Sequence, residues 1–421
     1  MRIAMIGPFG LRPKGTMAVR ALPLARELAA RGHAVLVVMP PWHPPAEAPR
    51  RWQEGGVQLA YVSLGPRWPG LSHLAITLRL ARHALAWGAE VIHCFKPKGY
   101  SGLALLVLWL ARRLGLCRAR LVVDEDDWEG PGGWNDLEPY SFWLRRFFAW
   151  QERWGLRHSD AVTVASRTLQ SLVWALGVPP ARVFYLPNGT AGERSPGDGA
   201  AARSRYGLQG APVVLLYTRF FEYDPARAVE VFRRIVQELP EARLLVVGRG
   251  LYAADEARFL QAVHAAGLDE AVVRAGWVPQ EELADHFAAA DVAIYPFDDT
   301  LVNRSKCSVK LLDLLAAGVP TVADAVGQNT EYIIQGETGL LVPSGDVAAM
   351  ARATLRLLQD QALRRALSVA AAQRSGRDYA WRVLAEVALA AYACAAGASS
   401  PYALRSAGGG GVSGSGSRPS I

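Results

Sequence analysis

Two lysines and an aspartate stand close together in an apolar segment, SKCSVKLLDLLAAGVP (305–320). Lys306 and Lys310 are four residues apart, so they would share one face of a helix that begins early. Ser308 is a suitable N-cap, which would leave free backbone N–H groups beside both lysines. Cations and helix N-termini stabilise phosphate groups. The pattern predicts a site for a diphosphate, with a solvated helix start as the alternative.

Acids and tryptophans crowd a second segment, VVDEDDWEGPGGWND (122–136), which we call the acid loop. Such side chains suit sugar hydroxyls and the apolar faces of sugar rings. Asp126 and Asp127 would also assist the deprotonation of an acceptor hydroxyl, as positioned carboxylates do in general base catalysis. The alternatives are a capped, solvent-exposed loop and a metal site, although nothing else in the sequence demands a metal.

The strand before the acid loop ends in polar residues that would line the same cleft. His93 and Lys96 lie in VIHCFK (91–96). Because alternate residues of a strand face opposite sides of the sheet, His93 has a second interpretation, a hydrogen-bonded histidine in the core. Both residues are candidates for the cleft.

A loop containing three glycines, GPFGLRPKGT (7–16), follows the first predicted strand. Gly10 and Gly15 would let a ligand approach the backbone closely. Lys14 would meet phosphate or acceptor. The loop lacks GxGxxG spacing, which argues against a dinucleotide site, and an ordinary flexible loop is the alternative.

Composition and charge narrow the class of partner. The chain has 421 residues, of which 51% are hydrophobic and 20% charged, so two or three folded domains are expected. The net charge is +8, with arginines spread through helix-like segments. This charge suits an anionic small ligand or a lipid surface. No nucleic-acid-binding signature is present, and no nucleic-acid partner is expected.

The cysteines and apolar runs indicate a cytoplasmic protein without a membrane span. Four cysteines lie far apart and follow no metal-ligand spacing, as expected of reduced thiols. The longest apolar run, SGLALLVLWL (101–110), is too short to cross a bilayer. Segment 141–158 mixes Trp and Phe with Arg. Packing against its domain is expected, and peripheral contact with the inner face of an anionic membrane is the alternative.

Strand-like and helix-like segments alternate along nearly the whole chain, which is the pattern of parallel sheets. The pattern runs from RIAMIG (2–7) to VFYLPNG (183–189) and restarts at PVVLLYT (212–218). The predicted fold is α/β, with two Rossmann-like doubly wound domains facing across a cleft and a C-terminal closing helix. Ligands of such sheets bind at the carboxyl ends of the strands. The predicted division is an N-terminal domain 1–190, a linker 191–210, a second domain 211–375, a closing helix 376–397 and a disordered tail 398–421.

Four stretches of sequence carry a resemblance to a known family. They are IGPFG…KGT…ALPLARELAARGHAVLVV, DAVTVAS…VFYLPNG, VVLLYTRF…ARLLVVGRG…VVRAGWVPQEELADHFAAADVAIYPF and KLLDLLAAGVPTVADAVGQNTEYIIQGETGLLVPSGD. In order and spacing they resemble the GT-B-fold glycosyltransferases of the family 4 type, the glycosyl transferases group 1. The resemblance covers the chain from residue 1 to about residue 395.

The resemblance implies an enzyme that moves a sugar from a nucleoside-diphosphate sugar to an acceptor, with retention at the anomeric carbon. The donor would bind mainly to the second domain. The acceptor, a glycan, a lipid or a small molecule, would bind to the first domain near residues 10–16 and 93–135. No metal cofactor is expected, so cations and helix N-termini would stabilise the leaving diphosphate.

Matching positions assign roles by resemblance. Arg219 matches the phosphate-binding arginine of the family. The partner lysine of the family is absent, and our hypothesis is that Lys306 substitutes for it, with Lys310 nearby. Asp313 matches the glutamate that binds the ribose hydroxyls. Ser305 stands where the family places a glutamate beside the donor sugar.

The remaining matches concern the nucleotide base and the donor sugar. Gly248 would let the nucleotide approach the backbone. Trp277 and Val278 match the loop that holds the base, and core packing is the alternative for Trp277. Asp126 and Asp127 stand where many relatives have a His-Asp pair.

Two alternative functions remain at this point. The same fold serves nucleotide-sugar epimerases. A non-catalytic protein that binds a carbohydrate or a partner is the other, since the glutamate, lysine and histidine of the family are missing.

Overall fold

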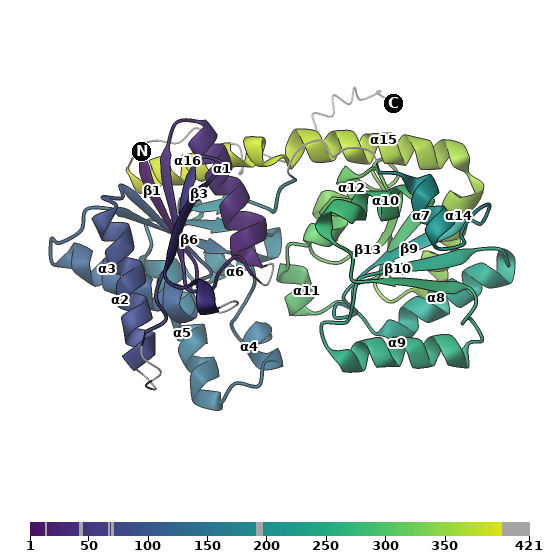
Figure 1. Ribbon diagram of the computed structural model, residues 1–421, viewed down its shortest axis with the longest axis horizontal. Helices are drawn as coiled ribbons and strands as arrows, with labels where there is room; N and C mark the ends of the chain where they lie inside the picture. The colour runs from purple at the N-terminus through teal and green to yellow at the C-terminus, as the bar shows by residue number, and fades with distance from the viewer. Residues whose placement is uncertain (13–14, 42–44, 66–67, 69–70, 191–196, 398–421) are drawn as a thin grey trace, which may run out of the picture.

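The computed structural model describes residues 1–12, 15–41, 45–65, 68, 71–190 and 197–397. Two α/β domains lie side by side, and a helical segment from the end of the described chain runs along both of them (Figure 1). Lys14, residues 191–196 of the predicted linker and the predicted tail 398–421 lie outside the described residues.

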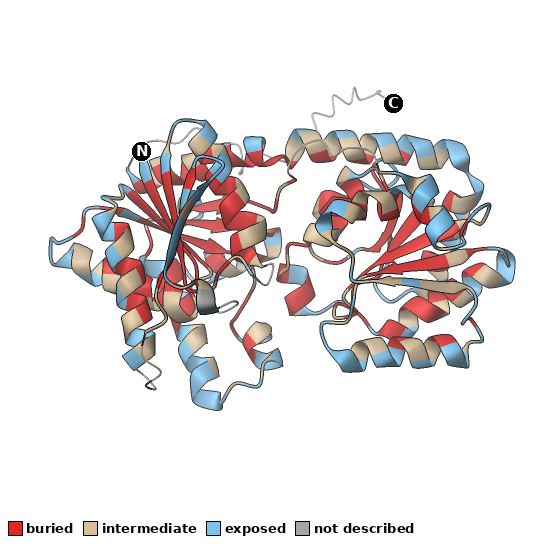
Figure 2. Cartoon of the chain, viewed as in Figure 1, coloured by how far each residue is buried: buried red, intermediate tan, exposed pale blue. Residues whose placement is uncertain are grey.

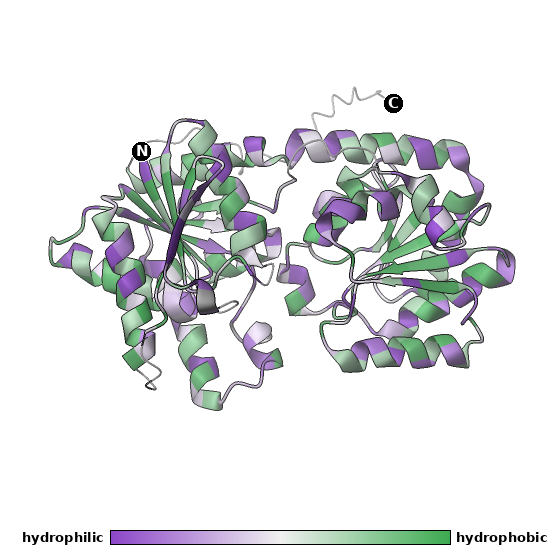
Figure 3. Cartoon of the chain, viewed as in Figure 1, coloured by the Kyte–Doolittle hydropathy of each residue, from purple (hydrophilic) through white to green (hydrophobic). Residues whose placement is uncertain are grey.

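The first domain is built on an eight-stranded sheet in the order β3-β4-β2-β1-β5-β6-β7-β8. Only the β3–β4 pair at one edge is antiparallel. The central strands are buried, continuous apolar runs because helices cover both faces of the sheet (Figures 2 and 3). The strands are β1 (Arg2–Ile6), β2 (Ala34–Met39), β3 (Arg50–Glu54), β4 (Val57–Tyr61), β5 (Val91–Phe95), β6 (Arg120–Glu125), β7 (Ala161–Val164) and β8 (Val183–Tyr185).

Helices α2, α3, α5 and α6 pack on one face of this sheet, and α1 and α16 pack on the other. In α5 only one stripe is buried, so the predicted packing of segment 141–158 against its domain is confirmed. The helical elements of this part of the chain are η1 (Met17–Ala21), α1 (Leu22–Ala30), η2 (Pro45–Glu47), α2 (Leu71–Ala86), α3 (Gly99–Arg113), α4 (Trp134–Leu137), α5 (Phe142–His158), α6 (Arg167–Ala175) and η3 (Pro180–Arg182).

The second domain is built on a six-stranded, wholly parallel sheet in the order β11-β10-β9-β12-β13-β14. The strand order reverses between β9 and β12, and a reversal of this kind opens a crevice for ligands at the carboxyl ends. The doubly wound fold predicted from the sequence is therefore confirmed. The strands are β9 (Val213–Tyr217), β10 (Arg243–Val247), β11 (Val272–Gly276), β12 (Val292–Tyr295), β13 (Thr321–Asp324) and β14 (Leu340–Val342).

Local signals fix several helices of the second domain. Helix α8 begins at Pro225, where the Asp224 carboxylate accepts the Ala226 N–H, as N-cap residues do. Helix α7 lies inside the predicted linker 191–210 and packs against α10 of the second domain. The helices here are α7 (Gly199–Arg205), α8 (Pro225–Glu238), α9 (Ala253–Ala265), η4 (Gln280–Glu282), α10 (Leu283–Ala288), α11 (Leu301–Ser305), α12 (Val309–Ala316), α13 (Asn329–Tyr332), α14 (Val347–Gln359) and α15 (Gln361–Asp378).

The segment predicted as a closing helix belongs to both domains. Helix α15 packs on α12 of the second domain, whereas α16 (Trp381–Ala395) packs on α1 and on the first sheet (Figure 1). At the crossing, the Thr190 N–H donates to the Tyr379 carbonyl at 2.8 Å, and the Trp381 N–H donates to the Thr190 carbonyl at 3.1 Å. The chain thus passes between the domains twice, at neighbouring points.

Candidate active site

A cavity of about 440 Å³ lies between the carboxyl ends of the two sheets. Both domains line it: Gly15, Asp126 and Asp127 come from the first, Lys306 and Lys310 from the second. Two larger hollows lie elsewhere, one beside the β3–β4 edge and one between the ends of α8 and α14. None of the predicted site residues lines either of these two hollows, so the cavity between the sheets is the candidate site.

Interdomain contacts hold this cavity together. The Asn188 N–H lies 3.0 Å from Cys307 Sγ, and its side-chain amide donates to the Cys307 carbonyl at 3.0 Å. On another side, the ring of Trp134 stacks on that of Phe221, with centroids 4.8 Å apart and an interplanar angle of 11°. Both pairs join residues of different domains, so these contacts hold the two halves of the cavity in position relative to each other.

Two cations pair with one buried carboxylate on the second-domain side, and a third, Lys310, lines the same cavity. Arg219 Nε lies 2.7 Å from Glu222 Oε1, and Lys306 forms an ion pair with the same oxygen. Burial opposes the ionisation of Glu222, but Lys306 and Arg219 outweigh burial and lower its pKa to about 2. Lys310 Nζ stands 3.6 Å from the ring centroid of Tyr217, and burial lowers the Lys310 pKa to about 8.

The two lysines do not share a helix face, contrary to the prediction. Helix α11 ends at Ser305, Lys306 is extended, and α12 begins only at Val309. The Ser308 hydroxyl pairs with the Tyr295 hydroxyl, so it does not cap α12 through its side chain. Lys306 and Lys310 still reach the same cavity because the chain turns between them.

Asp313 and Ser305, the two positions matched to family glutamates, differ in their placement. Asp313 lies in α12, is buried and lines the cavity. Ser305 is fully buried and does not line it, since its hydroxyl donates to the Val302 carbonyl at 3.0 Å. Its carbonyl accepts the Ser166 hydroxyl at 2.7 Å. Ser305 therefore joins the domains and does not contact a donor in this arrangement.

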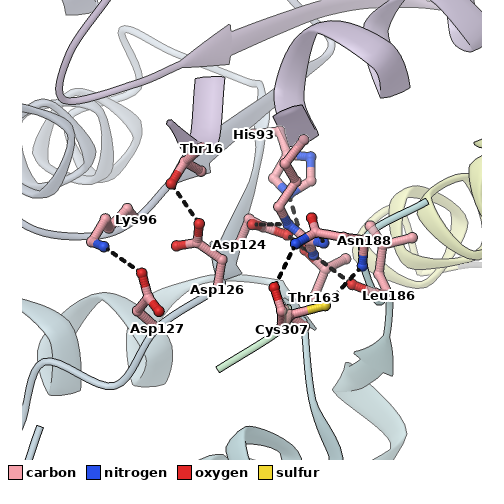
Figure 4. A network of polar contacts seen from close by, with 12 residues as sticks. Thr16, His93, Lys96, Asp124, Asp126, Asp127, Thr163, Leu186, Asn188 and Cys307 are labelled. Atoms are coloured by element: carbon pink, nitrogen blue, oxygen red, sulfur yellow. Dashed lines mark hydrogen bonds and ion pairs between the residues drawn. The ribbon is translucent and has the colours of Figure 1, made fainter. Parts of the chain in front are cut away.

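The acid loop places two different carboxyl groups in the cavity (Figure 4). The Thr16 hydroxyl donates to Asp126 Oδ2 at 2.5 Å, while Asp126 Oδ1 is buried without a hydrogen-bond partner among the described residues. Burial raises the Asp126 pKa to about 6, against the opposing effect of Lys96. Asp127 lies 2.9 Å from Lys96 Nζ, and Lys96 outweighs burial to lower the Asp127 pKa.

His93 does not line the cavity, so its assignment to the cleft was wrong and its core interpretation holds. The ring is fully buried; Nδ1 lies 2.9 Å from the Tyr392 hydroxyl and Nε2 lies 3.2 Å from the Thr163 hydroxyl. Burial lowers the His93 pKa to about 4. The ring is neutral at physiological pH, and its two hydrogen bonds connect β5 to α16 and to β7.

A buried ion pair beneath the cavity was not predicted. Arg20 and Asp124 are fully buried, with Nε–Oδ1 and Nη2–Oδ2 distances of 2.6 and 2.7 Å. Arg20 Nη2 also donates to the Leu186 carbonyl at 2.6 Å, and the Thr163 hydroxyl donates to Asp124 at 2.6 Å. The only signal in the sequence was a single arginine among the apolar residues MAVRALPLA (17–25).

Of the predicted glycines, only Gly15 lines the cavity between the sheets. Gly10 packs against the ring of Tyr61. Gly248 lines a separate hollow of about 430 Å³ at the ends of β10 and β11. A Cβ at Gly248 would stand 1.9 Å from the Thr218 carbonyl oxygen, and its φ is +122°. The close approach of the chain after β9 and the positive φ therefore require glycine at this position without any ligand.

Trp277 and Val278 follow β11 and line neither of these spaces. Trp277 is 68% exposed, so it is not a core residue. Val278 is half-buried and packs against the main apolar cluster. The structure therefore leaves the Trp277 indole accessible at the end of the second sheet.

The described residues contain no group of three His, Cys, Asp or Glu side chains arranged to hold a metal ion. They also contain no helix that is long and apolar enough to cross a membrane. The residues that the sequence did not single out are Glu222, which organises the cations, and Thr16, which holds Asp126.

Comparison with known proteins identifies the class. The model for the glycosyl transferase 4-like domain matches residues 15–189, and the model for the glycosyl transferases group 1 matches residues 211–360. The GDP-mannose-dependent alpha-(1-6)-phosphatidylinositol monomannoside mannosyltransferase of Mycolicibacterium smegmatis is 31% identical over 282 residues, 65% of this chain and 69% of that protein. The chain belongs to the group 1 glycosyltransferases, and it is a glycosyltransferase of the GT-B fold.

Further relatives agree with this assignment. The D-inositol 3-phosphate glycosyltransferase of Stackebrandtia nassauensis is 29% identical and covers 91% of this chain and 87% of its own length. Sucrose-phosphate synthase from Thermosynechococcus elongatus has the same fold, with a TM-score of 0.69, 22% identity and coverage of 91% of this chain and 96% of that one. Anabaena HepE, in complex with UDP and glucose, gives a TM-score of 0.69 at 16% identity, covering 92% and 98%. These matches do not favour the epimerase alternative.

Proposed function

We propose that this glycosyltransferase uses a nucleoside-diphosphate sugar and binds the diphosphate at Arg219, Lys306 and Lys310. The observation that carries the proposal is the gathering of these three cations on the second-domain side of the cavity, where two carboxyl groups, Glu222 and Asp313, face them and one positive charge is left over. Helix α12 begins at Val309 beside them, and its first N–H groups add partial positive charge. A departing diphosphate carries the complementary negative charge.

The names of two similar proteins support a donor of this class. The Mycolicibacterium enzyme is called GDP-mannose-dependent, and HepE has been solved with UDP-glucose. In the present chain, Asp313 follows Lys310 by one turn of α12 and is assigned to the ribose hydroxyls. The base is assigned to the ends of β10 and β11, near Gly248, Trp277 and Val278.

The transfer step then follows from the placement of charge. The bond between the anomeric carbon and the diphosphate oxygen breaks, and a bond from an acceptor oxygen forms on the same face of the sugar. The acceptor proton passes to Asp126, whose pKa of about 6 leaves it ionised and basic at neutral pH. Asp127, held by Lys96, orients the donor sugar or the acceptor. No metal enters this scheme.

A surface on the first domain supports peripheral attachment to a membrane on its cytoplasmic side. Helices α2, α3 and α5 lie on the same face of the sheet and hold two, two and four arginines; their one acid, Glu152, is buried. Arginines and exposed apolar side chains together suit anionic lipid. Exposed apolar residues of these helices include Leu74, Leu78, Leu110, Phe142, Trp143 and Trp150.

The location that we propose is the cytoplasm. All four cysteines are free, which agrees with a reducing compartment. Co-sedimentation with vesicles tests the attachment: phosphatidylglycerol vesicles should retain the protein and phosphatidylcholine vesicles should not. Equal behaviour on both would contradict it. The acceptor hydroxyl would then belong to a lipid-linked or soluble molecule that reaches the first domain.

Calorimetry and turnover with UDP- and GDP-sugars test the proposed function. Asp126→Asn should lower transfer by about 10²–10⁴, the usual effect of losing a positioned base, with nucleoside-diphosphate affinity near that of the wild type. Asp127→Asn should act in the same direction. EDTA should leave activity unchanged. Failure of the wild type to bind any nucleoside diphosphate would contradict the proposal, and chelator sensitivity would replace it with a metal-assisted mechanism.

A further inference from the structure

Two buried glutamates beneath the acid loop have no role in the site described above. Glu125 is the last residue of β6, and Glu152 lies in the buried stripe of α5. Alternate residues of a strand face opposite sides of the sheet. Asp124 faces Arg20 on the side of α1 and α16, so Glu125 faces the side that α5 covers. Both glutamates are 0% exposed, so the space between β6 and α5 encloses two carboxyl groups.

Three oxygen atoms of these two carboxyl groups lack a hydrogen-bond donor. Neither oxygen of Glu125 has a hydrogen-bond partner among the described residues, and the same is true of Glu152 Oε2. Glu152 Oε1 accepts the N–H of Glu129, in the acid loop, at 2.6 Å. Ionised carboxylates only accept hydrogen bonds, so two of them cannot satisfy each other. A buried polar atom without a partner costs free energy and calls for an explanation.

The neighbouring cations pair with other acids. Lys96 Nζ lies 2.9 Å from Asp127 Oδ2 and 3.1 Å from Glu129 Oε1. Lys98 Nζ lies 2.7 Å from Glu129 Oε2. Within the described residues, no ion pair reaches either of the two glutamates beneath the loop. Because a buried charge without a counter-charge is unstable, a carboxyl group in that position takes up a proton.

The pKa shifts of both glutamates agree with this argument. Burial, and next the charge of Glu152, raises the Glu125 pKa well above its usual value. Burial raises the Glu152 pKa from 4.5 to about 8. The other charged groups that face the two glutamates are Asp126, Glu129, Lys96 and Lys98. The acids among them raise these pKa values, and the lysines lower them without reversing the effect of burial.

We propose that Glu125 and Glu152 share at least one proton at neutral pH and that this proton-sharing pair positions the acid loop for catalysis. The protonated oxygen of one carboxyl group donates a hydrogen bond to the other. Glu152 Oε1 stays in place as the acceptor of the Glu129 N–H. Glu129 in turn holds Lys96, which pairs with Asp127 at the cavity. The catalytic purpose of the loop rests on the proposed function, whereas the shared proton does not.

Infrared spectroscopy tests the proton directly, because a neutral carboxyl group and a carboxylate absorb at different frequencies. At neutral pH the wild type should show the band of a neutral carboxyl group shielded from solvent. Glu125→Gln and Glu152→Gln should each shift or remove this band. Glu230→Gln is the matched control and should keep it, since Glu230 is 35% exposed and pairs with Arg233 and Arg234. The proposal is overturned if the wild type lacks the band or if neither Glu125→Gln nor Glu152→Gln alters it.

The pH dependence of stability is a second test. The unfolded chain releases glutamate protons near pH 4.5, whereas the folded pair keeps its proton up to about pH 8. Wild-type stability should therefore fall as the pH rises over this interval. The double variant Glu125→Gln/Glu152→Gln has no such proton to keep. Relative to this variant, the unfolding equilibrium constant of the wild type should rise by up to about tenfold per pH unit. Urea denaturation at several pH values measures the difference, and a difference independent of pH contradicts the proposal.

Hydrogen–deuterium exchange tests the positioning of the loop independently of activity. Glu152→Leu removes the acceptor of the Glu129 N–H, whereas Glu152→Gln keeps a carbonyl oxygen there. Exchange in the acid loop should be about tenfold faster in Glu152→Leu than in the wild type, as loss of a hydrogen bond predicts, and Glu152→Gln should restore slow exchange. With a nucleotide sugar that turns over, kcat should fall more in Glu152→Leu than in Glu152→Gln, with little change in the KM of the donor.

Wild-type exchange in Glu152→Leu would overturn the positioning role. If Glu152→Leu does not fold, the infrared and stability tests still decide the proposal, since they use only glutamine variants of the same shape. A wild type that shows the neutral carboxyl band and the expected pH dependence but transfers no sugar would count against the proposed function and not against the shared proton.

Discussion

Two groups of charged residues in this molecule use the same side-chain chemistry for different ends. In the first domain, Arg20 and Asp124 are fully buried, bond each other twice and are enclosed by further protein partners. In the cleft, Arg219 remains 30% exposed and shares Glu222 with Lys306. The Arg20–Asp124 pair, which we call the closed pair, is neutral in sum. The cluster of Arg219, Lys306 and Glu222, which we call the open cluster, has a net positive charge. Enclosure and charge balance, more than residue type, separate a structural ion pair from a ligand site.

The largest expected effect is on the closed pair. Arg20→Met leaves Asp124 buried without its cation, so the protein should lose about 3–5 kcal/mol of unfolding free energy. Urea denaturation measures this loss. The double variant Arg20→Met/Asp124→Leu should regain part of the stability because the unpaired charge is gone. A single variant within about 1 kcal/mol of the wild type would show that the pair is not structural.

In the cluster of Arg219, Lys306 and Glu222, we expect a loss of activity and not chiefly a loss of stability. Lys306→Met should remove roughly 2–4 kcal/mol of transition-state stabilisation, measured as a lower kcat/KM with the native donor. Arg219→Ala should have the same effect. Stability should fall less than in Arg20→Met, because Arg219 still pairs with Glu222 when Lys306 is replaced. Arg258→Met, which removes a 58% exposed cation in α9, is the matched control. Normal turnover in both cleft variants would contradict the assignment of Arg219 and Lys306 to the diphosphate of the donor.

A smaller effect is expected at Asp313, beside the cluster. Asp313→Asn keeps the shape of the side chain but loses a charge-assisted hydrogen bond to the ribose, worth about 1.5–3 kcal/mol. Isothermal calorimetry should show weaker binding of the nucleoside diphosphate with an unchanged melting temperature. If the affinity is that of the wild type, Asp313 serves only the packing of α12.

The smallest effect is expected from a change of pH alone, which acts on Asp126, a residue that is buried yet faces the cavity. Burial raises its pKa from 3.8 to about 6, so the carboxylate is protonated as the pH falls through 6. Transfer that needs the ionised base should therefore fall about tenfold for each pH unit below this value. A pH–rate profile without an inflection near pH 6 would remove Asp126 from the role of base.

The sequence was sufficient for the fold because the fold is encoded redundantly. Apolar strand runs and amphipathic helices recur along the chain. The βαβ pattern can therefore be recognised even where the periodicity of one segment is weak. The site was less accessible to sequence reasoning. The charged positions that open onto the cleft, Arg219, Lys306 and Asp127, could be selected from strand ends and from the family resemblance.

What escaped prediction depends on contacts between distant segments. Glu222 binds Lys306 across 84 residues, and Thr16 binds Asp126 across 110 residues, so neither pairing has a local signature. The error on His93 has the same origin. Alternation along the strand allowed the core interpretation, but the hydrogen-bond partner that favours it, Tyr392, lies 299 residues further along the chain.

The return of α16 to the first domain has a consequence for biosynthesis. Trp381, Leu384 and Tyr392 belong to the apolar core that packs against β1, β2 and α1. During translation these residues leave the ribosome after the whole of the second domain. Domains generally fold as units in order of synthesis, but here the first domain made is the last to be completed. Until α16 docks beside α1, part of one face of this sheet is open to water, and a chaperone has a defined surface to protect.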